Sequence, residues 1–171
     1  MSKLIVEVGM KLEKEFEFYD KMIKEHGLDQ VFSCETHDVY YTKEKSFEGL
    51  SENQIKNACV RIRNPKESDE AYQKNLINEG YRKVFDTKKK DFHYQNKKMK
   101  SRVQLQIIED IGLVVYYDNP KYYKYPLDKQ RELLFKELNT YGFNFTCNDL
   151  GIDKLRTLYF GKEMFSKNQN G

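Results

Sequence analysis

The first predicted strand reads LIVEVGMKL, residues 4–12, and its residue character alternates strictly. One side carries Leu4, Val6, Val8, Met10 and Leu12, and the other carries Ile5, Glu7, Gly9 and Lys11. Because successive side chains of a strand point to opposite faces, this spacing predicts a strand with one apolar and one polar face. The polar face holds a carboxylate and an ammonium group.

Later segments repeat this opposition of polar and apolar sides. In the strand predicted over Ala58–Arg63, Arg61 and Arg63 fall on the same side, and after Arg102 glutamines alternate with apolar residues. A further strand over Tyr81–Thr87 carries Lys83. Two arginines at i and i+2 repel each other unless an anion lies near both, and a phosphate chain would serve. The alternative is a solvated sheet face on which Arg61 and Arg63 pair with Glu7 or Asp38.

The order of predicted elements indicates the fold class. Amphipathic helices are predicted over 13–26, 126–142 and 153–163, and strands over 4–12, 31–42, 58–63, 81–87, 102–107 and 113–118. We expect the polar segment 46–57 to be a connection that includes one helical turn, and the polar segment 66–80 to be a loop. This order lacks a regular βαβ alternation, so it argues against a doubly wound parallel sheet and favours α+β.

Composition limits the class of protein. The chain has 171 residues, 33% charged and 14% aromatic, which predicts one globular domain over residues 1–171. A net charge of +3 predicts no nucleic-acid or membrane partner by itself. The three cysteines form no metal or disulfide pattern, and we see neither a signal peptide nor a membrane-spanning apolar run, so we expect a cytoplasmic protein.

The segment Lys88–Lys100 is strongly basic and contains three aromatic residues, Phe92, His93 and Tyr94. Basic segments with interspersed aromatics can bind single-stranded nucleic acid. They are more often solvated hairpins, so nucleic acid is a possible partner but not the favoured one.

Four segments taken in order resemble the CYTH superfamily, the triphosphate tunnel metalloenzymes. They are VEVGMK (6–11), DVYYT (38–42), ACVRIR (58–63) and IGLVVYYD (111–118), and the helices that follow the last of them also lie where the family has helices. The resemblance covers nearly the whole chain. It implies an antiparallel β-barrel of about eight strands flanked by amphipathic helices, whose interior is a tunnel for triphosphate.

The resemblance also implies roles for particular residues. Phosphate contacts would come from Lys11, Lys83, Arg61, Arg63 and Arg102, and Glu7 and Asp118 would bind Mg²⁺ or Mn²⁺. Glu7 and Lys11 would be catalytic. A triphosphate needs several arginines and lysines to balance its charge, and Mg²⁺ bridges phosphate oxygens to carboxylates.

The chain departs from the family at two acidic positions. The family has Glu-x-Glu-x-Lys on its first strand, where this chain has Gly9 at the central position, and Tyr116 replaces the first residue of the late acidic pair. Glu35 is a candidate third metal ligand that would partly compensate. We therefore expect a metal-dependent hydrolase of a triphosphate-bearing small molecule, such as inorganic, nucleoside or thiamine triphosphate. The alternative is a non-catalytic module that binds nucleotides or RNA 5′-triphosphates and has lost metal-binding carboxylates.

Overall fold

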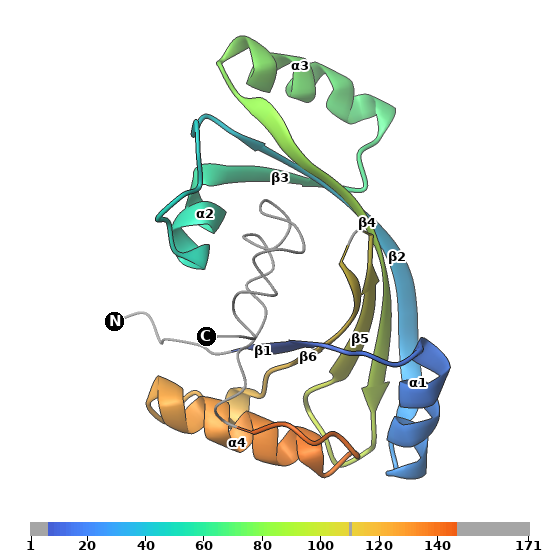
Figure 1. Ribbon diagram of the computed structural model, residues 1–171. Helices are drawn as coiled ribbons and strands as arrows, with labels where there is room; N and C mark the ends of the chain where they lie inside the picture. The colour runs from blue at the N-terminus through green and yellow to red at the C-terminus, as the bar shows by residue number, and fades with distance from the viewer. Residues whose placement is uncertain (1–6, 110, 147–171) are drawn as a thin grey trace. The chain divides into compact units, whose positions relative to one another are not determined.

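The computed structural model describes residues 7–109 and 111–146, and within them the fold is α+β (Figure 1). The described strands form one six-stranded antiparallel sheet in the order β1-β6-β5-β4-β2-β3. They are β1 (Val8–Lys11), β2 (Asp29–Thr42), β3 (Cys59–Arg63), β4 (Arg82–Gln95), β5 (Val103–Ile108) and β6 (Gly112–Tyr117). The α+β prediction is confirmed. The first residues of the strand predicted over 4–12 and the helix predicted over 153–163 lie outside the described residues.

The described helices number four. They are α1 (Phe16–Glu25), α2 (Glu52–Ala58), α3 (Glu70–Asn78) and α4 (Leu127–Asn139), with single 3-10 turns at Glu67–Asp69 and Pro120–Tyr122. Among these described helices, none combines the length and the apolar character needed to cross a membrane.

The chain divides into two compact units. The described residues of the first unit are 7–34, 91–107 and 112–146, and those of the second are 35–90, 108, 109 and 111. The boundary falls inside β2 and inside β4, so each of these long strands contributes one part to each unit.

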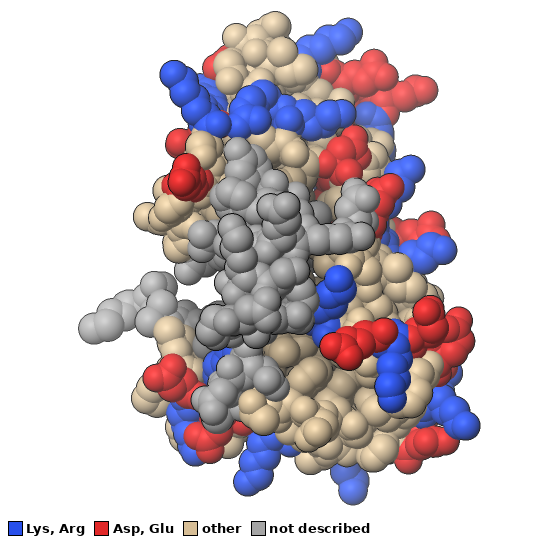
Figure 2. All heavy atoms as spheres, viewed as in Figure 1, with Lys and Arg blue, Asp and Glu red and all other residues tan. Residues whose placement is uncertain are grey.

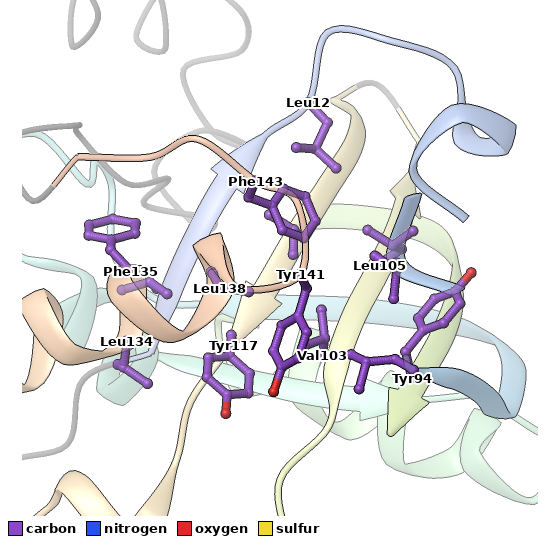
Figure 3. Close-up of a cluster of buried hydrophobic side chains, with 14 residues drawn as sticks. Leu12, Tyr94, Val103, Leu105, Tyr117, Leu134, Phe135, Leu138, Tyr141 and Phe143 are labelled. Carbon is purple, nitrogen blue, oxygen red and sulfur yellow. The ribbon is translucent and has the colours of Figure 1, made fainter. Parts of the chain in front are cut away.

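The core of the first unit lies between α4 and one face of the sheet (Figure 3). Antiparallel pairing sets Val8 opposite Tyr117, and both side chains are about 1% exposed. Leu134 and Leu138 of α4 pack into the same cluster, because a spacing of four residues places them on one helix face. The apolar side of the first strand is therefore the core side, as its alternation predicts.

The second unit has apolar clusters on both faces of β2. Tyr40 packs with Ile55 of α2, whereas Val39 and Tyr41 pack with Leu76 of α3. Since side chains alternate along a strand, the two helices cover opposite faces. Asp38 lies on the same face as Tyr40.

Two sequence predictions for this unit were wrong. The segment predicted as a loop, 66–80, contains α3, whose one buried residue, Leu76, leaves almost no apolar periodicity to detect. The strand predicted to end at Thr87 continues to Gln95. Its continuation escaped detection because Thr87, Lys89 and Asp91 are all less than 8% exposed, so the buried side of this strand is polar.

One further element is longer than expected. The segment 46–57, predicted as a connection with one helical turn, contains most of the seven-residue helix α2. The Ser51 side chain accepts a hydrogen bond from the Gln54 backbone N–H, and the Gln54 side chain accepts one from the Ser51 backbone. This Ser-x-x-Gln capping box is a helix start that is visible in the sequence.

Candidate functional site

A cluster of cations surrounds a buried carboxylate in the second unit. The register of β2 and β3 sets Asp38 opposite Arg63 and Tyr40 opposite Arg61. Arg63 Nε donates to Asp38 Oδ1 at 2.8 Å and Arg63 Nη2 to Oδ2 at 3.0 Å. Lys89 Nζ of β4 lies 3.4 Å from Asp38 Oδ2. We call Arg61, Arg63 and Lys89, together with Asp38, the cation cluster.

Asp38 organises this cluster electrostatically. Its side chain is 1% exposed and that of Lys89 is 6% exposed. Burial alone would raise the pKa of Asp38, but the Arg63 hydrogen bonds and the charge of Lys89 outweigh burial, so its pKa lies below the ordinary value. Asp38 is thus an anion that holds two cations in place, and the cluster has three positive charges for one negative.

The sequence predictions identified this site only in part. The ion pair of Arg63 with Asp38 is confirmed, although it was the alternative to phosphate binding. Lys89 was missed, because it lies in a basic run that was interpreted as a solvated hairpin. No sequence signal distinguishes it, because its neighbours Lys88 and Lys90 are lysines too. Figure 2 shows Lys and Arg side chains in a band over the part of the second unit that carries α3 and β3.

The first unit brings Glu7 and Asp118 together around one phenol. Val8 pairs with Tyr117, so Glu7 and Asp118 are the next residues along each strand. Tyr123 donates its hydroxyl hydrogen to Asp118 Oδ2 at 2.5 Å. Burial, this hydrogen bond and the negative charges of Asp118 and Glu7 raise the pKa of Tyr123 to about 12. The two carboxylates predicted as metal ligands are therefore close in space.

The two departures from the family pattern form a single cross-strand pair. Gly9 of β1 lies opposite Tyr116 of β6. A Cβ atom on Gly9 would lie only 2.4 Å from Cε1 of the Tyr116 ring. The ring therefore lies directly over the glycine, an arrangement in which an aromatic side chain fills the space that a glycine leaves in a sheet. The ring occupies the position between Glu7 and Lys11 on this face of β1.

We expect Gly9→Ala to destabilise the first unit by about 1–3 kcal/mol, because the buried Tyr116 ring must move to admit a methyl group. Urea denaturation of the single variants and of Gly9→Ala with Tyr116→Ala measures the effect. The double variant should recover most of the Gly9→Ala cost relative to Tyr116→Ala alone. Purely additive changes would contradict the coupling.

The remaining predicted residues lie in different surroundings. Lys11 pairs with Val114, and its Cε lies 3.8 Å from the Cβ position of Gly112. The Arg102 guanidinium lies 6.0 Å from the centre of the Phe32 ring. Both residues belong to the first unit, whereas the cation cluster belongs to the second.

Lys83 and Glu35 make ion pairs outside the cation cluster. Lys83 Nζ lies 3.3 Å from Asp86, and both side chains are about half exposed. Glu35 is 76% exposed and lies 3.5 Å from Lys90 Nζ. Alternation along β2 also sets Glu35 on the face opposite Asp38. We therefore do not include Lys83 or Glu35 in the proposed site.

The donor groups do not fit a resident metal ion. Within residues 7–109 and 111–146, no three His, Cys, Asp or Glu side chains gather in a way that could hold one. Glu7 and Asp118 provide two carboxylates, but Asp118 already accepts a hydrogen bond and Tyr116 fills the adjacent position. A site of this kind could take Mg²⁺ only if the ligand supplied phosphate oxygens as well.

The aromatic residues of the basic segment are partly removed from the surface. The Tyr94 side chain is fully buried in the core of the first unit, and its hydroxyl donates to Asp20 at 2.6 Å. Phe92 packs against the same core. Neither ring is therefore placed to stack freely on a nucleic-acid base.

Comparison with solved structures finds the same fold in several proteins. The PH1012 protein of Pyrococcus horikoshii OT3 is 13% identical, with a TM-score of 0.57, covering 82% of this chain and 92% of that one. A conserved hypothetical protein of Pyrococcus furiosus is 15% identical, with a TM-score of 0.51, covering 81% and 92%. A protein of Vibrio parahaemolyticus described as a "putative adenylate cyclase" is 15% identical, with a TM-score of 0.52, covering 83% and 90%.

No protein-family model matches the chain, and no curated protein matches it. At these identities the structural likeness establishes a shared fold and carries no activity with it. The fold of this chain is thus shared with the two Pyrococcus proteins and the Vibrio protein.

Proposed function

We propose that this protein binds a triphosphate-bearing small molecule and that the cation cluster makes the principal phosphate contacts. The observation that carries the proposal is the pair of buried side chains, Asp38 and Lys89, together with the more exposed Arg63, a group that holds more positive than negative charge. Desolvating a lysine is costly, so a fold that keeps Lys89 at 6% exposure gains most from it if an anion binds there.

The same proposal places the chain in the CYTH superfamily. Support comes from the order of the four sequence segments and from the shared fold with a protein described as a "putative adenylate cyclase". A closed tunnel of about eight strands is also part of this proposal. The described part of the chain contains six strands. Within the first unit, Lys11 and Arg102 are proposed as phosphate contacts because the sequence resemblance implies that role.

Binding without hydrolysis is the form of the proposal that the geometry supports best. The aromatic ring of Tyr116 lies where a metal-binding carboxylate would stand, and Gly9 cannot supply a second one. Phosphoryl transfer to water depends on metal and cationic side chains that position and stabilise the reacting groups. Only Glu7 and Asp118 remain of the metal-binding carboxylates. We therefore expect the protein to bind phosphate without hydrolysing it.

A second candidate function is hydrolysis with Mg²⁺ or Mn²⁺ bound jointly by the ligand. It is favoured by the position of Glu7 and Asp118, which adjoin the paired residues Val8 and Tyr117 and whose charges both add to burial in raising the pKa of Tyr123. When bound, the metal would polarise the terminal phosphate. In the first unit, Glu7 and Asp118 would hold such a metal together with phosphate oxygens of the ligand.

Calorimetry and a phosphate-release assay separate the two candidates. Tripolyphosphate, ATP and thiamine triphosphate would be titrated with EDTA, with Mg²⁺ and with Mn²⁺. Charge-assisted hydrogen bonds contribute about 1.5–3 kcal/mol each, so three cations should give a dissociation constant between roughly 1 mM and 1 μM in EDTA. Binding without phosphate release supports the leading proposal. Release that requires metal supports hydrolysis, and the absence of binding under every condition refutes both.

A further inference from the structure

The hydroxyl group of Tyr123 lies at the carboxylate pair of the first unit. Because Val8 pairs with Tyr117, Glu7 and Asp118 extend the same register by one position and share one face of the two strands. The Tyr123 hydroxyl donates to Asp118 Oδ2 at 2.5 Å, a short bond of the kind that a carboxylate ion accepts. Burial raises the pKa of Tyr123, and so do the negative charges of Asp118 and Glu7. One phenol is therefore close to both carboxylates.

A second tyrosine closes the neighbouring position on the same face. Tyr116 lies opposite Gly9, two residues along each strand from Asp118 and Glu7. Tyr116 is 5% exposed, and its ring covers the glycine. The carboxylate pair thus has an aromatic ring beside it. A divalent cation at the pair would depend on water or on a ligand for most of its six oxygen ligands.

A polar network joins the turn that carries Tyr123 to α4. Asn119 caps the 3-10 turn Pro120–Tyr122, because its Oδ1 accepts from the Lys121 backbone N–H at 3.1 Å. The Asn119 amide group donates to Glu137 Oε2 of α4 at 3.2 Å. Lys121 Nζ lies 3.0 Å from Glu137 Oε1. Tyr123 is the residue that ends this turn, so the network determines where its ring begins.

Burial favours a single arrangement of this network. Asn119 is 8% exposed, and the side chain of Glu137 is 15% exposed. The Asn119 amide group also donates to the Tyr117 hydroxyl at 3.1 Å, on the core side of β6. When one member of a buried polar network is lost, its partners stay unsatisfied, so alternative arrangements are costly. Helix α4 therefore holds the turn, and with it Tyr123, in one place.

A hydroxyl hydrogen and a divalent cation compete for the same carboxylate oxygen. The Tyr123 hydrogen bond satisfies a lone pair of Asp118 Oδ2, and the phenol occupies the space next to this oxygen. The phenol is uncharged, however, so it leaves the negative charges of Glu7 and Asp118 in place. If the hydroxyl group were removed, a cation would be the partner best suited to replace it.

We propose that Tyr123 takes the place of a divalent cation at the Glu7–Asp118 pair, and that Asn119 and Glu137 position it there. The protein then keeps this pair without a resident metal ion. All of these residues belong to the first unit, so the contact does not depend on whether the cation cluster binds phosphate. Failure to bind tripolyphosphate would refute the proposed function and leave the role of Tyr123 to be decided by metal titration.

Removing one hydroxyl group tests the exchange. Tyr123→Phe should tighten Mn²⁺ binding by about tenfold or more, because the ion no longer displaces a hydrogen bond to a carboxylate. Mn²⁺ alone, without phosphate, is titrated into the full chain, and the EPR signal of the free ion measures binding. Tyr125→Phe is the matched control, since Tyr125 is an exposed tyrosine two residues further on, and it should change Mn²⁺ affinity less than about twofold. Equal affinities of Tyr123→Phe and the wild type would overturn the proposal.

Asp118→Asn shows where the ion binds. Added to Tyr123→Phe, it should cancel the gain in Mn²⁺ affinity, because the amide group is uncharged and is a poorer metal ligand. A gain that survives this substitution would place the ion elsewhere and overturn the proposal. Tight Mn²⁺ binding by the wild type that Asp118→Asn abolishes would overturn it as well, because the phenol would then not exclude the ion.

Asn119→Ala tests the positioning role. We expect Mn²⁺ binding to tighten by about threefold or more, with no further gain when the change is combined with Tyr123→Phe, since both act through the same hydroxyl group. A purely structural role would lower the melting temperature and leave Mn²⁺ affinity unchanged. Glu137→Gln keeps the side-chain shape and repeats the test if Asn119→Ala does not fold. Unchanged Mn²⁺ affinity in the folded variant would remove the positioning role.

Discussion

Replacing Arg61 and Arg63 together by alanine should weaken tripolyphosphate binding by at least about 100-fold. Each arginine would make a charge-assisted hydrogen bond to phosphate, and two such bonds contribute about 3–6 kcal/mol in total. Arg63 additionally holds Asp38 through two hydrogen bonds, so its loss also disturbs the position of Lys89. Calorimetric titration of the wild type and the double variant in EDTA measures the change.

The matched control removes the same charge from the other face of β4. Lys88 and Lys90 are exposed and flank Lys89 in the sequence. Because strand side chains alternate, they point away from Asp38. Lys88→Ala with Lys90→Ala should change tripolyphosphate affinity less than threefold at about 0.15 M salt, where distant exposed charges are largely screened. If both double variants lose the same affinity for tripolyphosphate, then net charge alone explains the binding. The cation cluster would then not be the phosphate-binding site.

The single variant Arg61→Ala tests whether a loss of binding comes from a lost phosphate contact or from a loss of stability. Arg61 lies opposite Tyr40, beside rather than within the Asp38 ion pair described for Arg63. A thermal melt of each variant accompanies the titration. A folded Arg61→Ala protein that binds tripolyphosphate as tightly as the wild type would remove Arg61 from the site.

Asp38→Ala should lower the free energy of unfolding by about 3–5 kcal/mol. The substitution leaves Lys89 buried without its anion, and a buried charge that loses its partner is strongly destabilising. Urea denaturation provides the measurement. Asp86→Ala is the control: Asp86 is exposed and contacts Lys83 and His37, and a surface ion pair is worth about 1 kcal/mol or less. Equal losses in the two variants would show that the burial of Asp38 has no energetic consequence.

The same carboxylate predicts how stability responds to acid. The pKa of Asp38 in the folded protein lies below its value in the unfolded chain. Its stabilisation is therefore complete above the unfolded pKa of about 3.9 and disappears as the pH falls through the lower, folded pKa. Wild-type protein should lose more stability than Asp38→Asn as the pH falls through this window.

Much of the strand pattern could be predicted because alternation is a local property. The spacing of residues a few positions apart predicts three features. These are the polar side of β1, the shared face of Arg61 and Arg63, and the apolar stripe of α4. Local capping chemistry at Ser51 and Gln54 also marks a helix start. Prediction was wrong where a buried face is polar, as in β4, or where a helix such as α3 buries almost nothing.

The pairs that make up the candidate site could not be predicted in this way. Asp38 and Lys89 meet because β2 and β4 adopt one particular register, which no local pattern specifies. The same holds for the Tyr116 ring over Gly9.

The sequence by itself determined the α+β class, the polar faces of the strands and the two arginines on one of them. Only the tertiary structure decided that Asp38 holds Arg63 and Lys89 and that Tyr116 covers Gly9. The physical reason is that side-chain periodicity is encoded within one strand, whereas charge neutralisation and ring placement depend on which residues of other strands face it.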